Sequence, residues 1–194
     1  MSTSELTEVS RPRRFDAYAL RRFMGNFPTG VTVITCRRGD VVHGTTVNAF
    51  TSVSLDPPLA LVALDRRSRA AHLLGRGDYV INFLGEEQRD LAMHFAGRPM
   101  DGPVPWVDET GATPRLAGTV GHLVCRPWRE YDGGDHVLRL GAVEDFAAGQ
   151  GRPLLFFRGA FPELAPERTD IAWSLCLDGT APAEHFVTSH ETRK

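Results

Sequence analysis

The chain has 194 residues, of which 42 % are apolar, and its formal net charge is -2 at neutral pH. This length fits one ordinary domain with a core, and the mixed charge offers no basic face for nucleic acid. No apolar run is long enough to cross a bilayer, and the N-terminal stretch lacks the apolar segment of a signal peptide. We therefore expect a cytoplasmic protein without a membrane or nucleic-acid partner.

The predicted elements are mostly short strands. A polar tail, 1–13, comes first, and a Pro-, Gly- and Asp-rich connection over 98–116 is typical of a lid or an interface segment. The hydrophobic patterns predict helices over 15–24, 66–77 and 86–97, and strands over 30–36, 41–44, 59–64, 78–85, 118–131, 135–149 and 152–161.

Strands without a regular βαβ alternation favour a mainly β fold, an antiparallel barrel with a few helices. We divide the chain into a flexible tail over 1–13, a barrel domain over 14–161 and a C-terminal extension over 162–194 with weak periodicity. Cys36, Cys125 and Cys176 are far apart and odd in number, so they indicate buried thiols rather than a disulfide framework. The seven histidines show no metal-ligand spacing, and we predict no metal site.

The stretch HGTTVNAFTSVSLDPPLALVAL, residues 43–64, carries more hydroxyls and amides than a core strand needs. Such groups can hydrogen-bond a planar heterocycle or an anion. The composition alone favours a hydroxyl-rich edge strand that faces water, with a binding groove as the alternative. No P-loop and no G-x-S-x-G motif is present, and GRGDYV leads into a strand rather than a dinucleotide-binding helix.

Six segments, in order and with suitable gaps, resemble the short-chain flavin reductase family, the flavin:NAD(P)H reductase components of two-component monooxygenases. They are RRFMGNFPTGVTVITC (21–36), HGTTVNAFTSVSLDPPLALVAL (43–64), RRSRAAHLL (66–74), DYVINFL (78–84), DLAMHFAG (90–97) and GGDHVLRLGAVEDF (133–146). The resemblance implies an antiparallel split β-barrel of the FMN-binding type and a homodimer. It also implies reduction of FMN or FAD by NADH or NADPH, with reduced flavin passing to a separate oxygenase or halogenase.

The resemblance also implies roles for single positions in the flavin groove. Thr45, Thr46, Val47 and Asn48 are expected along the ribityl chain and the ring edge, and Thr51, Ser52 and Val53 at the pyrimidine end. The residues expected at the phosphate are Ala63, Asp65, Ser68 and Arg69. The family often has Asn-Arg-Ser-Ser-Arg-Thr at this loop, and this chain departs from it at Asp65, Arg67 and Ala70, which leaves the choice between FMN and FAD open. A solvated basic helix start is the alternative for this segment.

Further positions in the resemblance concern the nicotinamide side. His136, in GGDH, is expected to face the nicotinamide, with Asp135 holding its ring; a turn histidine that bonds locally is the alternative. Asn82, Phe95 and Gly141 are further expected contacts, with a strand-end residue and a core phenylalanine as the alternatives for the first two. Hydride transfer needs placement of two rings more than an acid or a base. A non-catalytic flavin carrier on the same barrel, or a barrel that holds haem or pyridoxal phosphate, stays open as another function.

Overall fold

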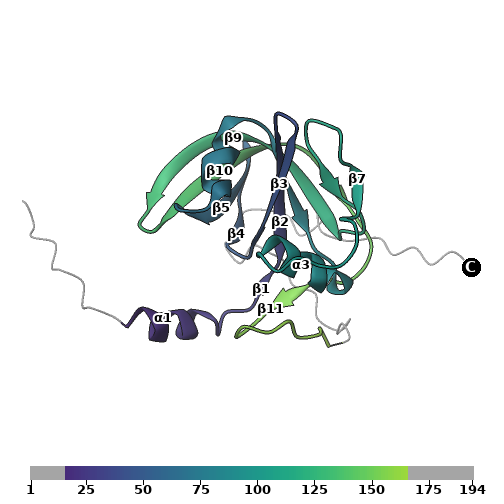
Figure 1. The fold of residues 1–194 in the computed structure, drawn as a ribbon. Coiled ribbons are helices and arrows are strands. Elements are labelled where there is room, and N and C mark those ends of the chain that lie inside the picture. The colour runs from purple at the N-terminus through teal and green to yellow at the C-terminus, as the bar shows by residue number, and fades with distance from the viewer. Residues whose placement is uncertain (1–15, 166–194) are drawn as a thin grey trace, which may run out of the picture. The chain divides into compact units, whose positions relative to one another are not determined.

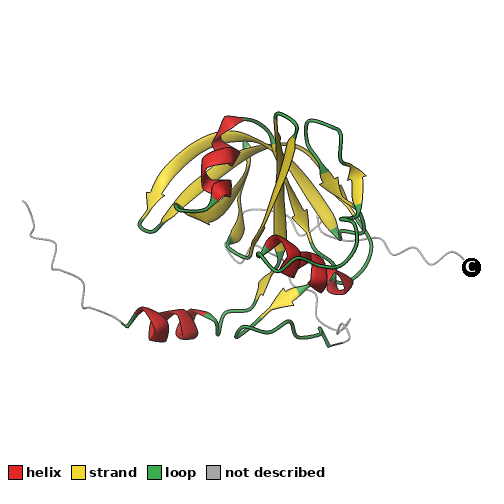
Figure 2. Cartoon of the chain, in the orientation of Figure 1, coloured by secondary structure: helices red, strands yellow, loops and turns green. Residues whose placement is uncertain are grey.

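The core of the molecule is one seven-stranded antiparallel sheet (Figures 1 and 2), seen in a computed structural model that describes residues 16–165. The strand order β3-β2-β6-β9-β10-β5-β4 leaves β3 and β4 as its edges. The strands are β2 (Thr32–Arg38), β3 (Val41–Val47), β4 (Phe50–Leu55), β5 (Pro58–Asp65), β6 (Tyr79–Phe83), β9 (Gly121–Gly133) and β10 (His136–Ala148).

Two short strand pairs and three α-helices complete the described residues. Strand β1 (Thr29–Gly30) pairs with β11 (Leu155–Phe156), and β7 (Trp106–Asp108) pairs with β8 (Arg115–Leu116). The helices are α1 (Ala17–Met24), α2 (Arg69–Leu73) and α3 (Arg89–Phe95), with 3₁₀ turns over Leu74–Arg76 and Glu86–Gln88. The predicted mainly β, antiparallel architecture is confirmed.

Strand β2 separates two hydrophobic clusters, because its side chains alternate between the faces of the sheet. Ile34 and Cys36 pack in one cluster with Val62 and residues of α2, and Val33 packs in the other with Leu91 of α3. Each fully buried aliphatic side chain stabilises the fold by about 1.5–3 kcal/mol. Burial on both faces explains why this strand is apolar and β-branched rather than alternating in polarity.

Helix boundaries follow from capping side chains. Asp16 accepts a hydrogen bond from the main-chain N–H of Tyr18 at 2.9 Å, which starts α1 close to the predicted position. Helix α2 begins at Arg69, later than predicted, because Ser68 Oγ accepts from the Ala71 N–H at 3.1 Å and thereby caps the helix. None of the residues described here forms a helix long and apolar enough to span a membrane.

The predicted strand over 152–161 was wrong in extent, since only Leu155–Phe156 is a strand. Pro153 has no N–H for a ladder. Arg158 and Gly159 adopt positive φ values of 50° and 83°, which turn the chain back on itself. The predicted tail over 1–13, most of the extension over 162–194 and Cys176 lie outside the described residues, and the domain boundaries stay a prediction.

The connection over 98–116 is fixed to the sheet. Thr35 Oγ1 donates to the Pro114 carbonyl at 2.5 Å, and Arg37 Nε donates to the Gly111 carbonyl at 2.9 Å. The amide oxygen of Asn82 accepts from the Leu116 N–H at 3.0 Å. With its second half held by three side chains of the sheet, this segment has the contacts of a packed loop rather than those of a lid.

Candidate functional site

A groove of about 220 Å³ brings together residues that are far apart in the sequence. Its wall is formed by β3 and the residues that follow it, its floor by the end of β5, and one end by the first residue of β10. The lining residues are Thr45, Thr46, Val47, Asn48, Ala49, Ala63, Leu64, Asp65, Ser68 and His136. Eight of these ten were predicted as cofactor contacts, seven at the flavin and His136 at the nicotinamide; Ala49 and Leu64 were not among them, although both stand beside predicted positions.

The hydroxyls of Thr45 and Thr46, both on β3, differ in their hydrogen bonding. Thr46 Oγ1 donates to the Ala92 carbonyl at 2.6 Å and so joins β3 to α3. On the same side of the strand, Gly44 lies against the ring of Phe95, which leaves no room for a side chain. Asn48 donates through Nδ2 to Thr29 Oγ1 at 3.3 Å. The hydroxyl proton of Thr46 is therefore engaged, whereas the hydroxyl of Thr45 has no hydrogen-bond partner among residues 16–165.

The loop at the end of β5 carries a carboxylate and a serine. Asp65 accepts from the Arg67 N–H at 2.8 Å and from its guanidinium at 2.8 and 3.1 Å. These bonds hold the pKa of Asp65 well below its usual range, so the carboxylate is ionised at neutral pH. Ser68 lines the groove while capping α2. Arg69, predicted at the phosphate, does not line the groove.

The positive charge of Arg69 affects the pKa of His43, a residue of β3. Burial lowers the pKa of His43 on β3, and the positive charge of Arg69 lowers it further. His43 therefore favours its neutral form at neutral pH. Helix α2, which begins at Arg69, contacts β3, but Arg69 is not part of the groove lining.

His136 is the first residue of β10 and lies opposite Asp65 of β5 in the sheet register. Its ring Nδ1 donates to Asp135 Oδ1 at 2.7 Å. This bond orients the imidazole and leaves Nε2 for another partner. Because 42 % of the side chain is exposed and it lines the groove, His136 is accessible to a molecule that lies there.

Three predicted residues of β4 do not line the groove. Thr51, Ser52 and Val53 lie on the edge strand and are exposed. The pairing of β4 with β5 shifts between Ser52 and Ser54, so a bulge at Val53 interrupts the ladder. The role of these three residues at the pyrimidine end of a flavin stays a prediction.

Asn82, Phe95 and Gly141 also lie away from the groove. Asn82 is fully buried and donates to the Val33 carbonyl at 2.9 Å and to Thr35 Oγ1 at 3.0 Å, while its oxygen accepts from Leu116. Phe95 stacks edge to face with His94 and Trp106 at centroid distances of 4.8 and 6.2 Å.

Gly141 was expected to let a cofactor ring approach the strand, but the ring that packs against it is that of Tyr79. A Cβ at this position would meet the Tyr79 hydroxyl at 2.2 Å and the Cβ of Cys125 at 2.9 Å. Gly141 is therefore required by packing inside the sheet, and Asn82, Phe95 and Gly141 all have structural contacts that account for them.

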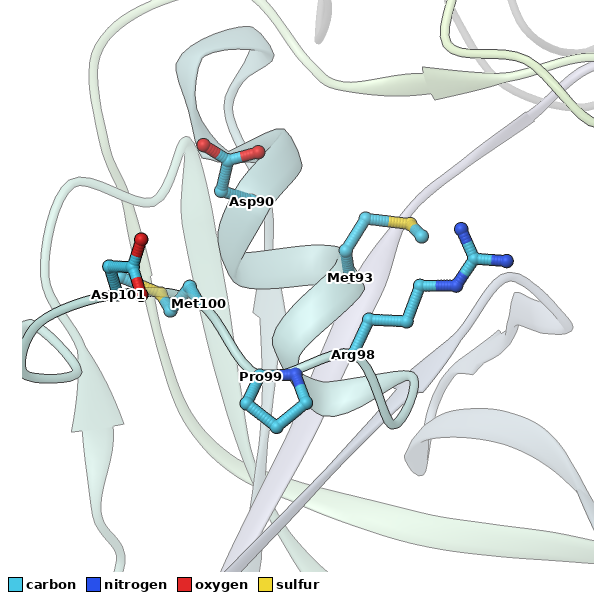
Figure 3. Close-up of a pocket in the computed structure, with 6 residues that line it drawn as sticks. All are labelled: Asp90, Met93, Arg98, Pro99, Met100 and Asp101. Carbon is cyan, nitrogen blue, oxygen red and sulfur yellow. The ribbon is translucent and has the colours of Figure 1, made fainter.

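A second depression lies at the end of α3 and measures about 310 Å³ (Figure 3). Figure 3 shows Met93 and Arg98 extending to one side of the helix end, with Asp90 and Asp101 on the other. Polar groups that converge on one point mark a binding site, and these do not converge. The groove at His136 is the better candidate although it is smaller. Within residues 16–165, no three His, Cys, Asp or Glu side chains are grouped closely enough to hold a metal ion.

The groove has the chemistry that a flavin requires. Val47, Ala49, Ala63 and Leu64 supply apolar surface for a planar ring, while hydroxyls, an amide and main-chain N–H groups from the same strands supply polar contacts. Its volume is smaller than the about 300–1,000 Å³ of a pocket that encloses a whole cofactor. The groove is therefore an open depression rather than an enclosed pocket.

Comparisons with known proteins identify the class. A family model described as flavin reductase like domain matches residues 24–165. An NADH-dependent flavin reductase from Rhodococcus is 40 % identical over 159 residues, which cover 79 % of this chain and 90 % of that protein.

Two solved structures agree with this result. The NADH:FAD oxidoreductase SgcE6 of Streptomyces globisporus, in complex with NAD and FAD fragments, matches with a TM-score of 0.72 and 38 % identity over 78 % of this chain and 94 % of its own. BorF, the flavin reductase component of a bacterial two-component tryptophan halogenase, matches with a TM-score of 0.70 and 33 % identity over 79 % and 100 %.

The fold is therefore that of the split-barrel flavin reductases. The chain belongs to the flavin reductase-like domain family. The predicted family, fold class and enzyme class, an NAD(P)H-dependent reductase of FMN or FAD, are confirmed. The comparisons leave the roles of single groove residues as predictions.

Proposed function

We propose that this enzyme binds flavin in the groove between β3 and the end of β5, reduces it with NADH or NADPH beside His136, and releases it to a separate oxygenase or halogenase. The observation that carries the proposal is the grouping of Thr45–Asn48, Asp65, Ser68 and His136 around one groove. These residues come from three strands and one helix cap and are distant in sequence. Stabilising contacts between sequence neighbours therefore do not explain why they line one groove.

The reaction moves a hydride, one hydrogen with two electrons, from the nicotinamide ring to the flavin ring. The protein's task is to hold both rings at the required distance and angle, which contributes most to such a step. Main-chain N–H groups and hydroxyls of β3 bind the flavin edge on which negative charge grows during reduction. The apolar residues of β5 exclude water from the opposite face.

His136 is assigned to the nicotinamide side. Its Nδ1 is held by Asp135, so its Nε2 can bond or its ring can stack against an incoming nucleotide. Ser68, at the other end of the lining, is the residue closest in kind to a phosphate ligand, since its hydroxyl accepts from the Ala71 N–H and still has its own proton to donate to an anion.

A homodimer completes the site in this proposal. The groove is shallow for a flavin, and α1 exposes an apolar face on which no residue is buried. The exposed fractions of Tyr18, Phe23, Met24 and Phe27 are 64–75 %, more apolar surface than a helix normally leaves in water. A second copy that covers these residues and the β4 edge would also enclose the flavin. Sedimentation equilibrium tests this part, and a monomer at micromolar concentration with full activity would contradict it.

The proposed partner is an oxygenase or halogenase component that accepts reduced flavin, and the proposed location is the cytoplasm, where reduced nicotinamide nucleotides are available. Support for the partner comes from the BorF likeness, since that protein serves a halogenase. Mixing the enzyme with a flavin-dependent oxygenase should couple NADH oxidation to product formation.

The test of the reaction is a steady-state assay that crosses FMN and FAD with NADH and NADPH. We expect flavin-dependent loss of nicotinamide absorbance with at least one pair. His136→Ala should lower turnover with the nucleotide more than it lowers flavin affinity, whereas His72→Ala, an exposed histidine of α2 outside the groove, should leave both unchanged. Equal losses of turnover and affinity in His136→Ala would show that the histidine only supports the fold.

A further inference from the structure

The turn that presents His136 contains two adjacent glycines. It joins β9 to β10 through Gly133 and Gly134, and Gly134 has a φ of 75°, a conformation that residues with a Cβ rarely adopt. Glycine restricts the backbone less than any other residue, so these two residues alone do not fix the conformation of the turn. His136 follows directly, so the orientation of its ring depends on what fixes this turn.

Arg66, in the loop after β5, contacts the turn at three points. Its main-chain N–H donates to the Asp135 carbonyl at 3.1 Å. Its Nε donates to the Gly134 carbonyl at 2.7 Å, and its Nη2 donates to Asp132 Oδ1 at 2.5 Å. Asp132 Oδ1 also accepts from the Gly134 N–H at 2.8 Å. The guanidinium therefore bridges both ends of the turn with two donors in a fixed geometry.

The same loop forms part of the groove. Asp65 and Ser68, on either side of Arg66, line the groove, and Asp65 is paired with His136 in the register of β5 and β10. Arg66 thus connects the loop assigned to the flavin phosphate with the turn assigned to the nicotinamide. A shift of one relative to the other would change the distance between the two bound rings.

We propose that Arg66 is a positioning residue for flavin reduction, which acts by fixing the Asp132–Asp135 turn so that the His136 ring stays over the groove. This proposal rests on the role given to His136 under the proposed function. Arg66 matches the arginine of the family loop quoted above, but the resemblance gave it no role, and its side chain does not line the groove.

A purely stabilising ion pair is the other explanation of these contacts. The side chains of Arg66 and Asp132 are 43 % and 82 % exposed, and pairs this exposed contribute about 0–1 kcal/mol to stability. The two explanations therefore predict different results for Arg66→Ala. A stabilising pair predicts a small loss of stability with normal catalysis, and a positioning role predicts normal stability with slower hydride transfer.

The test is a double-mutant cycle between Arg66→Ala and His136→Ala, read as kcat with NADH at saturating flavin. We expect Arg66→Ala to lower kcat by about three- to tenfold, less than the ~100-fold that a 1 Å misplacement can cost. In the His136→Ala background the same substitution should change kcat less than 1.5-fold (about 0.2 kcal/mol), because the residue through which Arg66 acts is gone. Arg66→Lys should fall between wild type and Arg66→Ala, since lysine can reach Asp132 but lacks the planar fork.

The control is Arg67→Ala, an adjacent arginine whose side chain is 88 % exposed and bonds only Asp65. It should leave the coupling between positions 66 and 136 unchanged. If Arg66→Ala fails to fold, Asp132→Ala serves in its place: it removes the bond from Arg66 Nη2 and the bond from the Gly134 N–H, and it should give a loss of kcat that also disappears without His136.

The outcomes separate this inference from the proposed function. Equal losses from Arg66→Ala in both backgrounds would overturn the positioning role while leaving His136 at the nicotinamide. Normal kcat in His136→Ala alone would overturn both the role of His136 and the inference. Normal kcat in Arg66→Ala with a lower melting temperature would show that the contacts only stabilise the fold.

Discussion

Substituting alanine for Gly44 tests whether β3 and α3 are packed as described. A Cβ at this position would lie 2.3 and 2.4 Å from Cε1 and Cδ1 of Phe95. Carbon atoms in contact are normally about 3.5–4.0 Å apart, so the ring must retreat by roughly 1 Å or more. Its edge-to-face contacts with His94 and Trp106 limit that movement.

The expected cost follows from these distances. Overpacking of this kind costs about 1–3 kcal/mol, and the removal of a glycine from a strand returns about 0.5–1 kcal/mol. The net loss of about 1–2 kcal/mol corresponds to a melting temperature lower by about 2–8 °C for a chain of this size. Thermal unfolding followed by circular dichroism measures it.

A second substitution makes the prediction specific. Phe95→Leu removes the ring edge, so Gly44→Ala should be nearly neutral in that background, and the two changes should couple by more than about 0.5 kcal/mol. Gly30→Ala is the matched control, because a Cβ there meets no atom within 4 Å. An unchanged melting temperature for Gly44→Ala, or an equal loss with leucine at position 95, would refute the described packing of α3 on β3.

Three further predictions concern buried polar groups and surface carboxylates. Tyr79→Phe should keep activity and raise stability by up to about 1–3 kcal/mol, since the buried hydroxyl has no hydrogen-bond partner among the described residues; chemical denaturation measures this. Asn82→Ala should cost about 2–4 kcal/mol, because three hydrogen bonds to two segments, β2 and β8, are lost, and limited proteolysis should then cut within 98–116. Asp65, Asp108 and Asp132 all have pKa values lowered by hydrogen bonds, so their contribution to stability should be complete above about pH 4 and fall as the pH drops through their folded values. A melting temperature independent of pH between 5 and 2 would contradict that last assignment.

Most strands of the sheet could be predicted from the sequence because β-branched runs and turn residues are short-range patterns, although β4 was not predicted. The groove could not be derived in this way, because composition alone favoured a water-facing edge strand. The resemblance to the flavin reductase family, rather than a local pattern, was the basis for expecting Thr45–Asn48 and His136 at a cofactor, and these residues line one groove.

The remaining positions were set by partners distant in sequence. In the sequence, Asn82 and Gly141 both resemble groove residues. In the structure, the amide oxygen of Asn82 accepts a hydrogen bond from Leu116, and Tyr79 fills the space beside Gly141. Likewise, Arg66 and Arg67 are identical in type and adjacent, but Arg66 bonds a turn 66–69 residues further along and Arg67 bonds its own loop. No local pattern distinguishes such pairs, because the contacts form only when β5 and β10 are adjacent.

Flavin is expected to bind in the groove between β3 and β5 with its phosphate end near Ser68. The most direct measurement is a crystal structure of the enzyme soaked with FAD and a non-reducing nicotinamide analogue. We predict the isoalloxazine ring along Thr45–Asn48 and the nicotinamide beside His136. Flavin density at the α3 depression around Arg98, with the groove left to solvent, would contradict the account.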